Sequence, residues 1–71
     1  MNDQEKIDNR AAAVLVAPIG TRLFWNPLGH FKRDSEKLGI APHGKVYVRI
    51  RNVFGVWYET YADPREFELR V

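Results

Sequence analysis

Apolar and polar residues alternate most regularly between residues 45 and 62, and this alternation predicts a β-hairpin. In its first half, Val46, Val48 and Ile50 alternate with tyrosine and arginine residues, the period-two pattern of a half-buried strand. Residues 56–61 repeat the alternation. The hairpin should therefore have one apolar face and one face of aromatic and charged side chains.

The turn at residues 52–55 sets the register of this hairpin. Its sequence begins with asparagine, which favours the first position of a type I turn, and ends with Gly55, which accepts a positive φ. We therefore expect a three-residue loop with a glycine bulge, which places Arg49 opposite Glu59. A two-residue loop would shift the register by one and bring Trp57 to the core face.

The remaining pattern predicts two more strands and one helical turn. Alternating residues at 21–26 and at 67–71 indicate short strands, and an aspartate before a proline indicates a single helical turn at 63–66. The segment 27–44 lacks such alternation and predicts a long irregular loop. A short turn of helix beginning near Asp34 is the only regular structure expected within it.

The N-terminal segment is less clear. Residues 1–10 are polar and predict a flexible arm. Residues 11–17 leave both helix and strand open, because alanines favour a helix and the Val-Leu-Val run favours a strand. Pro18 disfavours the helical conformation at the preceding residue, so a strand at 13–17 is preferred.

The expected order of strand, long loop, hairpin, helical turn and closing strand resembles that of SH3-like small barrels. The resemblance is to a topology and covers about residues 21–71. We therefore predict a single domain at 11–71 that is mostly β, with a small α+β fold as the alternative, and an SH3-like barrel of about five short strands. The expected core is Val46, Val48, Ile50, Val56, Tyr58, Phe67 and Leu69, with Leu23 and Trp25 packed against them.

Composition limits the class of protein. The chain has 71 residues, no cysteine and a net charge of +2, with the basic residues concentrated at 30–51 and the acidic ones at 52–71. The absence of cysteine fits a reducing compartment. No apolar run reaches the roughly 18 residues of a membrane helix, and the N-terminus is too polar for a signal peptide. We expect a cytoplasmic protein that does not bind membranes.

The sequence carries no catalytic or metal-binding signature. Its only serine, Ser35, lacks the flanking glycines of a nucleophile elbow, and the glycines are isolated turn residues. His30 and His43 are thirteen residues apart, without the compact spacing of metal ligands. We therefore expect a protein that is not an enzyme and that needs no metal and no cofactor.

The outer face of the hairpin is the candidate binding surface, because tyrosine, tryptophan and arginine are enriched at binding hot spots. Within this face we expect Arg51 to stack on Trp57 and Arg49 to pair with Glu59. The preferred function is a small protein-binding module, whose partner is another protein or a second copy of the chain. The alternative is a protein that binds single-stranded RNA or DNA with the same face. In a third, purely structural interpretation, residues 11–17 cover this face. The candidate binding residues are Tyr47, Arg49, Arg51, Phe54, Trp57 and Tyr61.

Overall fold

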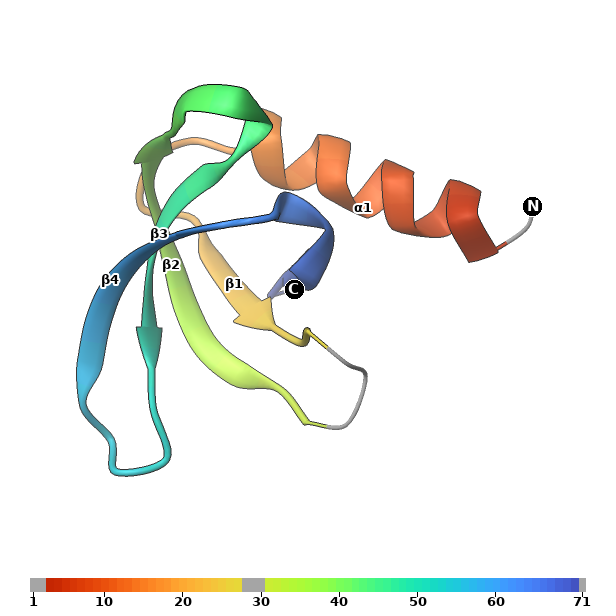
Figure 1. Cartoon of the computed structure of the whole chain (residues 1–71). Coiled ribbons are helices and arrows are strands. Elements are labelled where there is room, and N and C mark those ends of the chain that lie inside the picture. Colours follow the sequence, from red (N-terminus) through yellow and green to blue (C-terminus); the bar gives the residue numbers. More distant parts are fainter. Residues whose placement is uncertain (1–2, 28–30, 71) are drawn as a thin grey trace.

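The structure, a computed structural model, describes residues 3–27 and 31–70, which form a small α+β fold with one five-stranded sheet. The elements are α1 (Asp3–Val16), β1 (Arg22–Trp25), β2 (Arg33–Ile40), η1 (Pro42–Gly44), β3 (Val46–Arg51), β4 (Trp57–Ala62), η2 (Pro64–Glu66) and β5 (Phe67–Leu69). Neighbouring strands are antiparallel, in the order β4-β3-β2-β1-β5 (Figure 1). The prediction of a mostly β fold with antiparallel strands therefore agrees with the structure.

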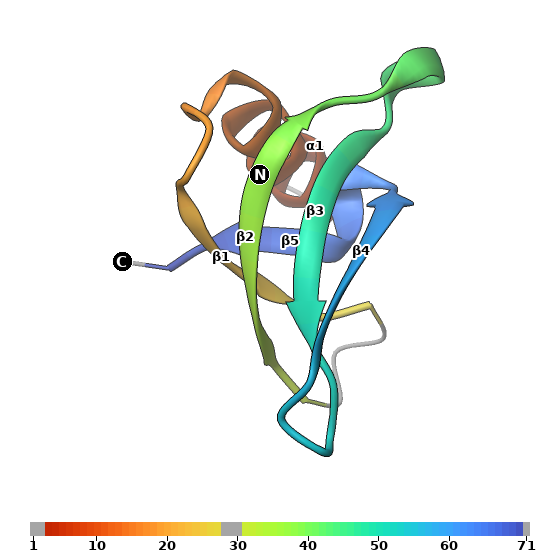
Figure 2. The same ribbon diagram turned by 90° about the vertical axis from the view of Figure 1, so that its left-hand side faces the viewer.

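The sheet is open. Within the described residues, β4 and β5 form its two edges and do not pair with each other. The closed SH3-like barrel that the sequence suggested is therefore not confirmed. The helix α1 packs against β5 and η2 and lies behind β2 and β3 in the view of Figure 2. In the described part of the chain, no helix is long and apolar enough to cross a membrane.

The core lies between the sheet and α1. Its buried side chains are Val14, Leu23, Val46, Val48, Ile50 and Phe67, with Trp25, Ala62 and Leu69 partly buried against them. The predicted core is confirmed on β3, at Leu23 and at Phe67. It is wrong at Val56 and Tyr58, which are 58% and 40% exposed. These two residues lie at the β4 edge, whereas α1 packs at the opposite edge.

The N-terminal segment is a helix, so the preference for a strand at 13–17 is wrong. Ala11 and Val14 are buried, and their spacing of three places both on the helix face that meets the core. The helix ends shortly before Pro18, as expected for a residue that disfavours helix in front of it. The boundary expected after the arm at 1–10 falls inside this helix.

A buried lysine joins the end of α1 to the sheet. Lys37 on β2 is only 2% exposed, and its ammonium donates to the backbone carbonyls of Val14, Leu15 and Ala17 at 3.0, 2.7 and 2.7 Å. A helix leaves its last carbonyls without partners within the helix, and a cation at that end is also favoured by the helix dipole. Burial lowers the pKa of Lys37. This one side chain therefore satisfies three acceptors at the C-terminus of α1.

Strand β2 occupies much of the segment predicted to be irregular at 27–44, so that prediction is wrong. The helical turn expected from Asp34 is also absent, since this residue pairs within the sheet. The inward positions of β2 are Ser35 and Lys37, which are buried polar residues opposite Ile50 and Val48 on β3. The apolar alternation that reveals a strand is therefore missing from this one.

The β3–β4 hairpin confirms the register derived from the sequence. Arg49 lies opposite Glu59, and the backbone N–H of Gly55 donates to the carbonyl of Asn52 at 3.0 Å. Gly55 has the expected positive φ, 80°. The side-chain Oδ1 of Asn52 accepts hydrogen bonds from the backbone N–H groups of Phe54 and Val56, which fixes the loop locally.

The helical turn predicted at 63–66 is present as η2. Asp63 caps it, because its Oδ1 accepts a hydrogen bond from the backbone N–H of Arg65 at 2.9 Å. The Arg65 side chain also donates to this carboxylate, and these hydrogen bonds lower the pKa of Asp63 to about 2. The cap and the buried ring of Pro64 direct the chain from β4 into β5.

Candidate binding surface on the outer face of the hairpin

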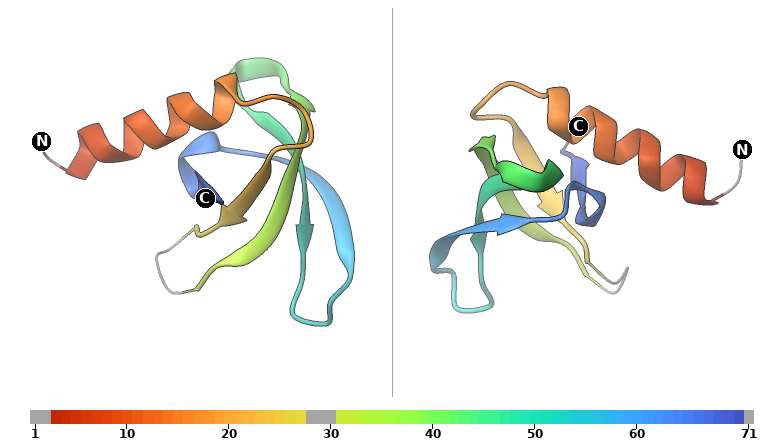
Figure 3. Two further views of the ribbon diagram at one scale, coloured as in Figure 1. Left: turned by 180° about the vertical axis from the view of Figure 1, so that it is seen from behind. Right: turned by 45° about the horizontal axis from the view of Figure 1, so that its top comes forward.

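The outer face of β3 and β4 is not covered by the helix. Val14 of α1 belongs to the core on the inner side of the sheet, and the hairpin extends away from α1 (Figure 3). Tyr61 is 65% exposed, and Trp57 is partly exposed. The interpretation in which residues 11–17 cover this face is therefore wrong.

Trp57 is held in a stack, but its partner differs from the expected one. The guanidinium of Arg49, not that of Arg51, lies 4.4 Å from the centre of the Trp57 ring. Arg49 in turn pairs with Glu36 on β2, to which its Nε donates at 2.8 Å, instead of with Glu59. The three side chains come from three adjacent strands, so the sheet itself holds the tryptophan in place.

The two tyrosines of the face form a second group. The rings of Tyr47 and Tyr61 lie opposite each other on β3 and β4, with centroids 4.9 Å apart. The Tyr47 hydroxyl donates to the carboxylate of Glu59, and this hydrogen bond raises the pKa of Tyr47. Such cross-strand contacts already restrict these side chains. Less conformational freedom is therefore lost when a partner binds.

The other two candidate residues lie toward the tip of the hairpin. Phe54 is 86% exposed, the largest exposed fraction among the described large apolar residues. The side chain of Arg51 lies beside Gly55, where an added Cβ would come within 3.2 Å of its Nη2. The structure therefore brings together Tyr47, Arg49, Trp57 and Tyr61 on the strands and places Arg51 and Phe54 next to the loop.

The charges on this face nearly cancel. Arg49 and Arg51 are accompanied by Glu36 and Glu59 on the same side of the sheet. A surface that binds the phosphates of a nucleic acid usually has a clear excess of basic side chains. The balance of charge on the strands is therefore unlike that of a phosphate-binding surface.

Sequence reasoning missed the two carboxylates of this surface as site residues. Glu36 lies in a segment predicted to be irregular, and its neighbours give no apolar alternation that would reveal the strand. Glu59 was placed on the correct face but treated only as a partner of Arg49. Its actual contact, with Tyr47, links the tyrosine pair to the rest of the face.

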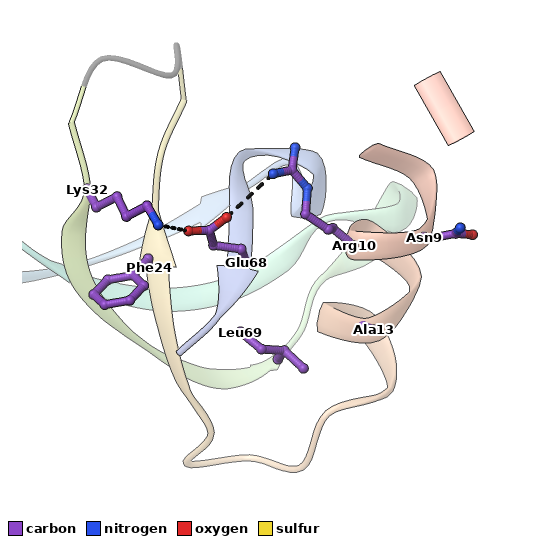
Figure 4. Close-up of a pocket in the computed structure, with 7 residues that line it drawn as sticks. All are labelled: Asn9, Arg10, Ala13, Phe24, Lys32, Glu68 and Leu69. Atoms are coloured by element: carbon purple, nitrogen blue, oxygen red, sulfur yellow. Dashed lines mark hydrogen bonds and ion pairs between the residues drawn. The ribbon is translucent and has the colours of Figure 1, made fainter. Parts of the chain in front are cut away.

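A separate hollow of about 480 Å³ lies between α1 and the strands β1 and β5, away from the hairpin (Figure 4). Its floor includes the ring of Phe24 and the side chain of Leu69. The only carboxylate in its lining, Glu68, forms ion pairs with Lys32 at 2.5 Å and with Arg10 at 3.4 Å. Both cations engage this carboxylate, which faces no nucleophile or second carboxylate in the lining of the hollow.

The structure shows no arrangement typical of a catalytic or metal site in the described residues. Groups of three or more potential metal ligands are absent from residues 3–27 and 31–70. Ser35 is 1% exposed, with its hydroxyl facing the interior and not a cleft. His43 lies in η1 with a φ of 61°, and His30 lies outside the described residues.

Comparisons with protein-family models, with curated proteins and with solved structures found no match to this chain. The geometry of the surface therefore carries the functional argument.

Proposed function

We propose that the protein is a non-catalytic binding module that recognises another protein, or a second copy of itself, with the outer face of β3 and β4. The observation that carries this proposal is the partly exposed stack of Arg49 on Trp57, in which Arg49 also pairs with Glu36. Tryptophan and arginine in a preordered arrangement provide area and hydrogen bonds at a low cost in conformational entropy.

The proposal extends to the fold, which we infer to be a variant of the SH3-like small barrel. The strand order β4-β3-β2-β1-β5, with a 3-10 turn before the last strand, supports a relation to SH3-like small barrels. In this view the barrel is open between β4 and β5, which leaves the outermost strand of the binding face accessible.

The proposal is tested with two matched aromatic substitutions. Trp57 and Phe31 each lie under an arginine at 4.4 Å, Arg49 and Arg33 respectively, but on different hairpins. Immobilised wild-type protein, Trp57→Ala and Phe31→Ala are compared for retention of interacting proteins from a cell extract, and light scattering of the purified proteins reports self-association. We expect Trp57→Ala to abolish the retained protein or the self-association and Phe31→Ala to preserve it.

Both variants should remain folded, because an exposed cation–π contact contributes about 1 kcal/mol or less. Equal binding by all three proteins would contradict the proposal, provided that circular dichroism shows them folded.

Binding of single-stranded nucleic acid is the second candidate, and one observation favours it. A shallow hollow of about 250 Å³ between the two hairpin ends is lined by Lys32, Arg33 and Arg51, with Asp34 as its only carboxylate. Asp34 is already paired with Arg70 at 3.4 Å, and Lys32 is paired with Glu68 at 2.5 Å. Nucleic-acid binding would weaken steeply as salt is raised, because bound counterions are released from the phosphates. An aromatic protein interface would respond only weakly to salt.

A further inference from the structure

The free edge of β4 presents the backbone of the same residues that form the binding face. The N–H of Asn52 donates to the carbonyl of Val56 at 2.8 Å, which makes this a hydrogen-bonded pair of the hairpin. Hydrogen-bonded and non-hydrogen-bonded pairs alternate in an antiparallel ladder. In the observed register, the N–H and C=O groups of Trp57, Glu59 and Tyr61 therefore point away from β3 toward the edge.

Strand β4 lacks most of the features that usually protect an edge, and Glu59 is its one charged side chain. Edge strands are commonly short, bulged, or interrupted by lysine or proline. The six residues of β4 are Trp-Tyr-Glu-Thr-Tyr-Ala, and their register with β3 is unbroken. No strand in the described part of the chain pairs with the outer side of β4. The edge is therefore regular, and among its outward backbone groups the Tyr61 carbonyl accepts a long hydrogen bond, 3.3 Å, from the Thr60 hydroxyl.

The inner side of β4 has room for the side chains of an added strand. A hollow of about 380 Å³ is lined by Ile50, Tyr58 and Thr60 on the hairpin, and its lining also includes Trp25 and the charged residues Lys45, Asp63 and Glu66. Tyr58 is 40% exposed there, although it belongs to the face that covers the core on β3. Apolar side chains from an added strand would cover it.

We propose that the partner is an extended segment of another protein that adds to β4 as an antiparallel sixth strand, with a basic side chain opposite Glu59. This inference rests on the proposed function and specifies its partner. The strand would bind through main-chain hydrogen bonds to Trp57, Glu59 and Tyr61, the mode known as β-augmentation. Its alternate side chains would lie beside the aromatic face and over the hollow.

Charge determines the choice of occupant. Glu59 is the only charged residue of β4, and its carboxylate accepts a hydrogen bond from neutral Tyr47. A lysine or arginine directly opposite it forms a favourable cross-strand pair, whereas a like charge is unfavourable. Two copies paired antiparallel through β4 in the register centred on Glu59 would place the two Glu59 side chains opposite each other. That register of two copies is therefore disfavoured, whereas a basic side chain opposite Glu59 is favoured.

The test uses synthetic peptides and the complete protein. The probe is a capped peptide in which isoleucine alternates with threonine and a single lysine occupies the central threonine position. One form carries an N-methyl group on the lysine amide, which would face Glu59, and a matched form carries it on the next isoleucine amide, which would face away. Binding is measured from NMR shifts of the backbone amides of Trp57, Glu59 and Tyr61.

We expect the peptide to bind and methylation of the lysine amide to weaken binding about tenfold or more, because a main-chain hydrogen bond is lost and the methyl group blocks approach. Methylation of the isoleucine amide should have a much smaller effect. A peptide with glutamate in place of lysine should bind the wild type more weakly than the lysine peptide does. The same glutamate peptide should bind the Glu59→Lys variant more tightly than it binds the wild type. Equal effects of the two methyl groups, or no shift at any of the three amides, would overturn the inference.

A protein variant gives an independent check. Glu59→Pro removes an N–H that faces the edge and so should leave the β3–β4 ladder intact, as prolines are tolerated at such positions. Compared with Glu59→Ala, it should bind the lysine peptide several-fold more weakly. If Glu59→Pro unfolds, the two methylated peptides still decide the question with wild-type protein.

The outcomes separate this inference from the proposed function. If Trp57→Ala loses partner binding while both methylated peptides bind equally well, the outer face remains the binding surface. Strand addition is then overturned. Self-association that Glu59→Pro abolishes would show that a second copy occupies the edge, and would also overturn the peptide proposal.

Discussion

The two edges of the sheet are built differently. β5 has three residues, and α1 packs against it, with Arg10 reaching the carboxylate of Glu68. β4 has six residues, carries exposed aromatic side chains and has no neighbouring element on its outer side among the described residues. An open sheet must manage both of its edges, because unpaired backbone groups attract other strands. This chain packs its own helix against one edge strand and leaves the other without such a neighbour in the described residues.

The covered edge depends on Lys37. Replacing it with methionine keeps much of the side-chain length but leaves three backbone carbonyls at the end of α1 without their donor. We expect Lys37→Met to lower the free energy of unfolding by about 2–4 kcal/mol, because each buried acceptor left unsatisfied costs about 1–3 kcal/mol and three carbonyls lose this donor together. Urea denaturation followed by circular dichroism measures this loss.

Release of α1 would also expose the β5 edge, so Lys37→Met should self-associate at concentrations at which the wild type does not. A variant with unchanged stability and unchanged light scattering would show that α1 is held by other contacts.

The accessible edge depends on the β3–β4 turn. Gly55 has a φ of 80°, so Gly55→Val places a β-branched residue in a strained backbone conformation. We expect a loss of about 1–3 kcal/mol in the free energy of unfolding. Gly55→Asn should lose less, because asparagine tolerates positive φ. Equal losses for valine and asparagine, measured by thermal and urea unfolding, would contradict the assignment of strain to this turn.

The capped turn η2 connects β4 to β5. Of the three changes, replacing its cap should have the smallest effect on the free energy of unfolding. Replacing Asp63 with alanine should cost about 1 kcal/mol, as is typical for an N-cap. The folded-state pKa of Asp63, about 2, lies below its ordinary value of 3.8, so its contribution is complete above that ordinary value. The contribution is lost as the pH falls toward the folded-state value.

The expected stability of the wild type therefore declines between about pH 5 and pH 2 more than that of Asp63→Ala. Parallel curves for the two proteins, from urea unfolding at each pH, would show that the carboxylate does not carry the effect.

The sequence was most informative where local rules and packing agree. In the β3–β4 hairpin, the alternation of Val46, Val48 and Ile50 and the turn at Asn52 and Gly55 specify the same register, and the structure has it. The candidate residues were correctly placed on the outer face or next to the loop. Their pairing was not, because the partner of Arg49 comes from β2.

The errors have a common physical origin in tertiary contacts. β2 has polar residues inside, because Lys37 satisfies the end of a distant helix, so its pattern carries no apolar period. The run at 13–17 is helical because Val14 packs on the core, which local propensity does not reveal. The burial of Val56 and Tyr58 was overestimated because nothing in the sequence shows which edge the helix will cover.

Hydrogen exchange of the backbone amides of β4 tests the central claim most directly. In dilute protein without a partner, we expect Tyr58, Thr60 and Ala62 to exchange slowly, since their N–H groups bond to β3. Trp57, Glu59 and Tyr61 should exchange rapidly, because their N–H groups face the free edge. NMR measurement of this alternation would establish an accessible edge, whereas equally slow exchange at all six amides would show that the edge is already covered and contradict the account.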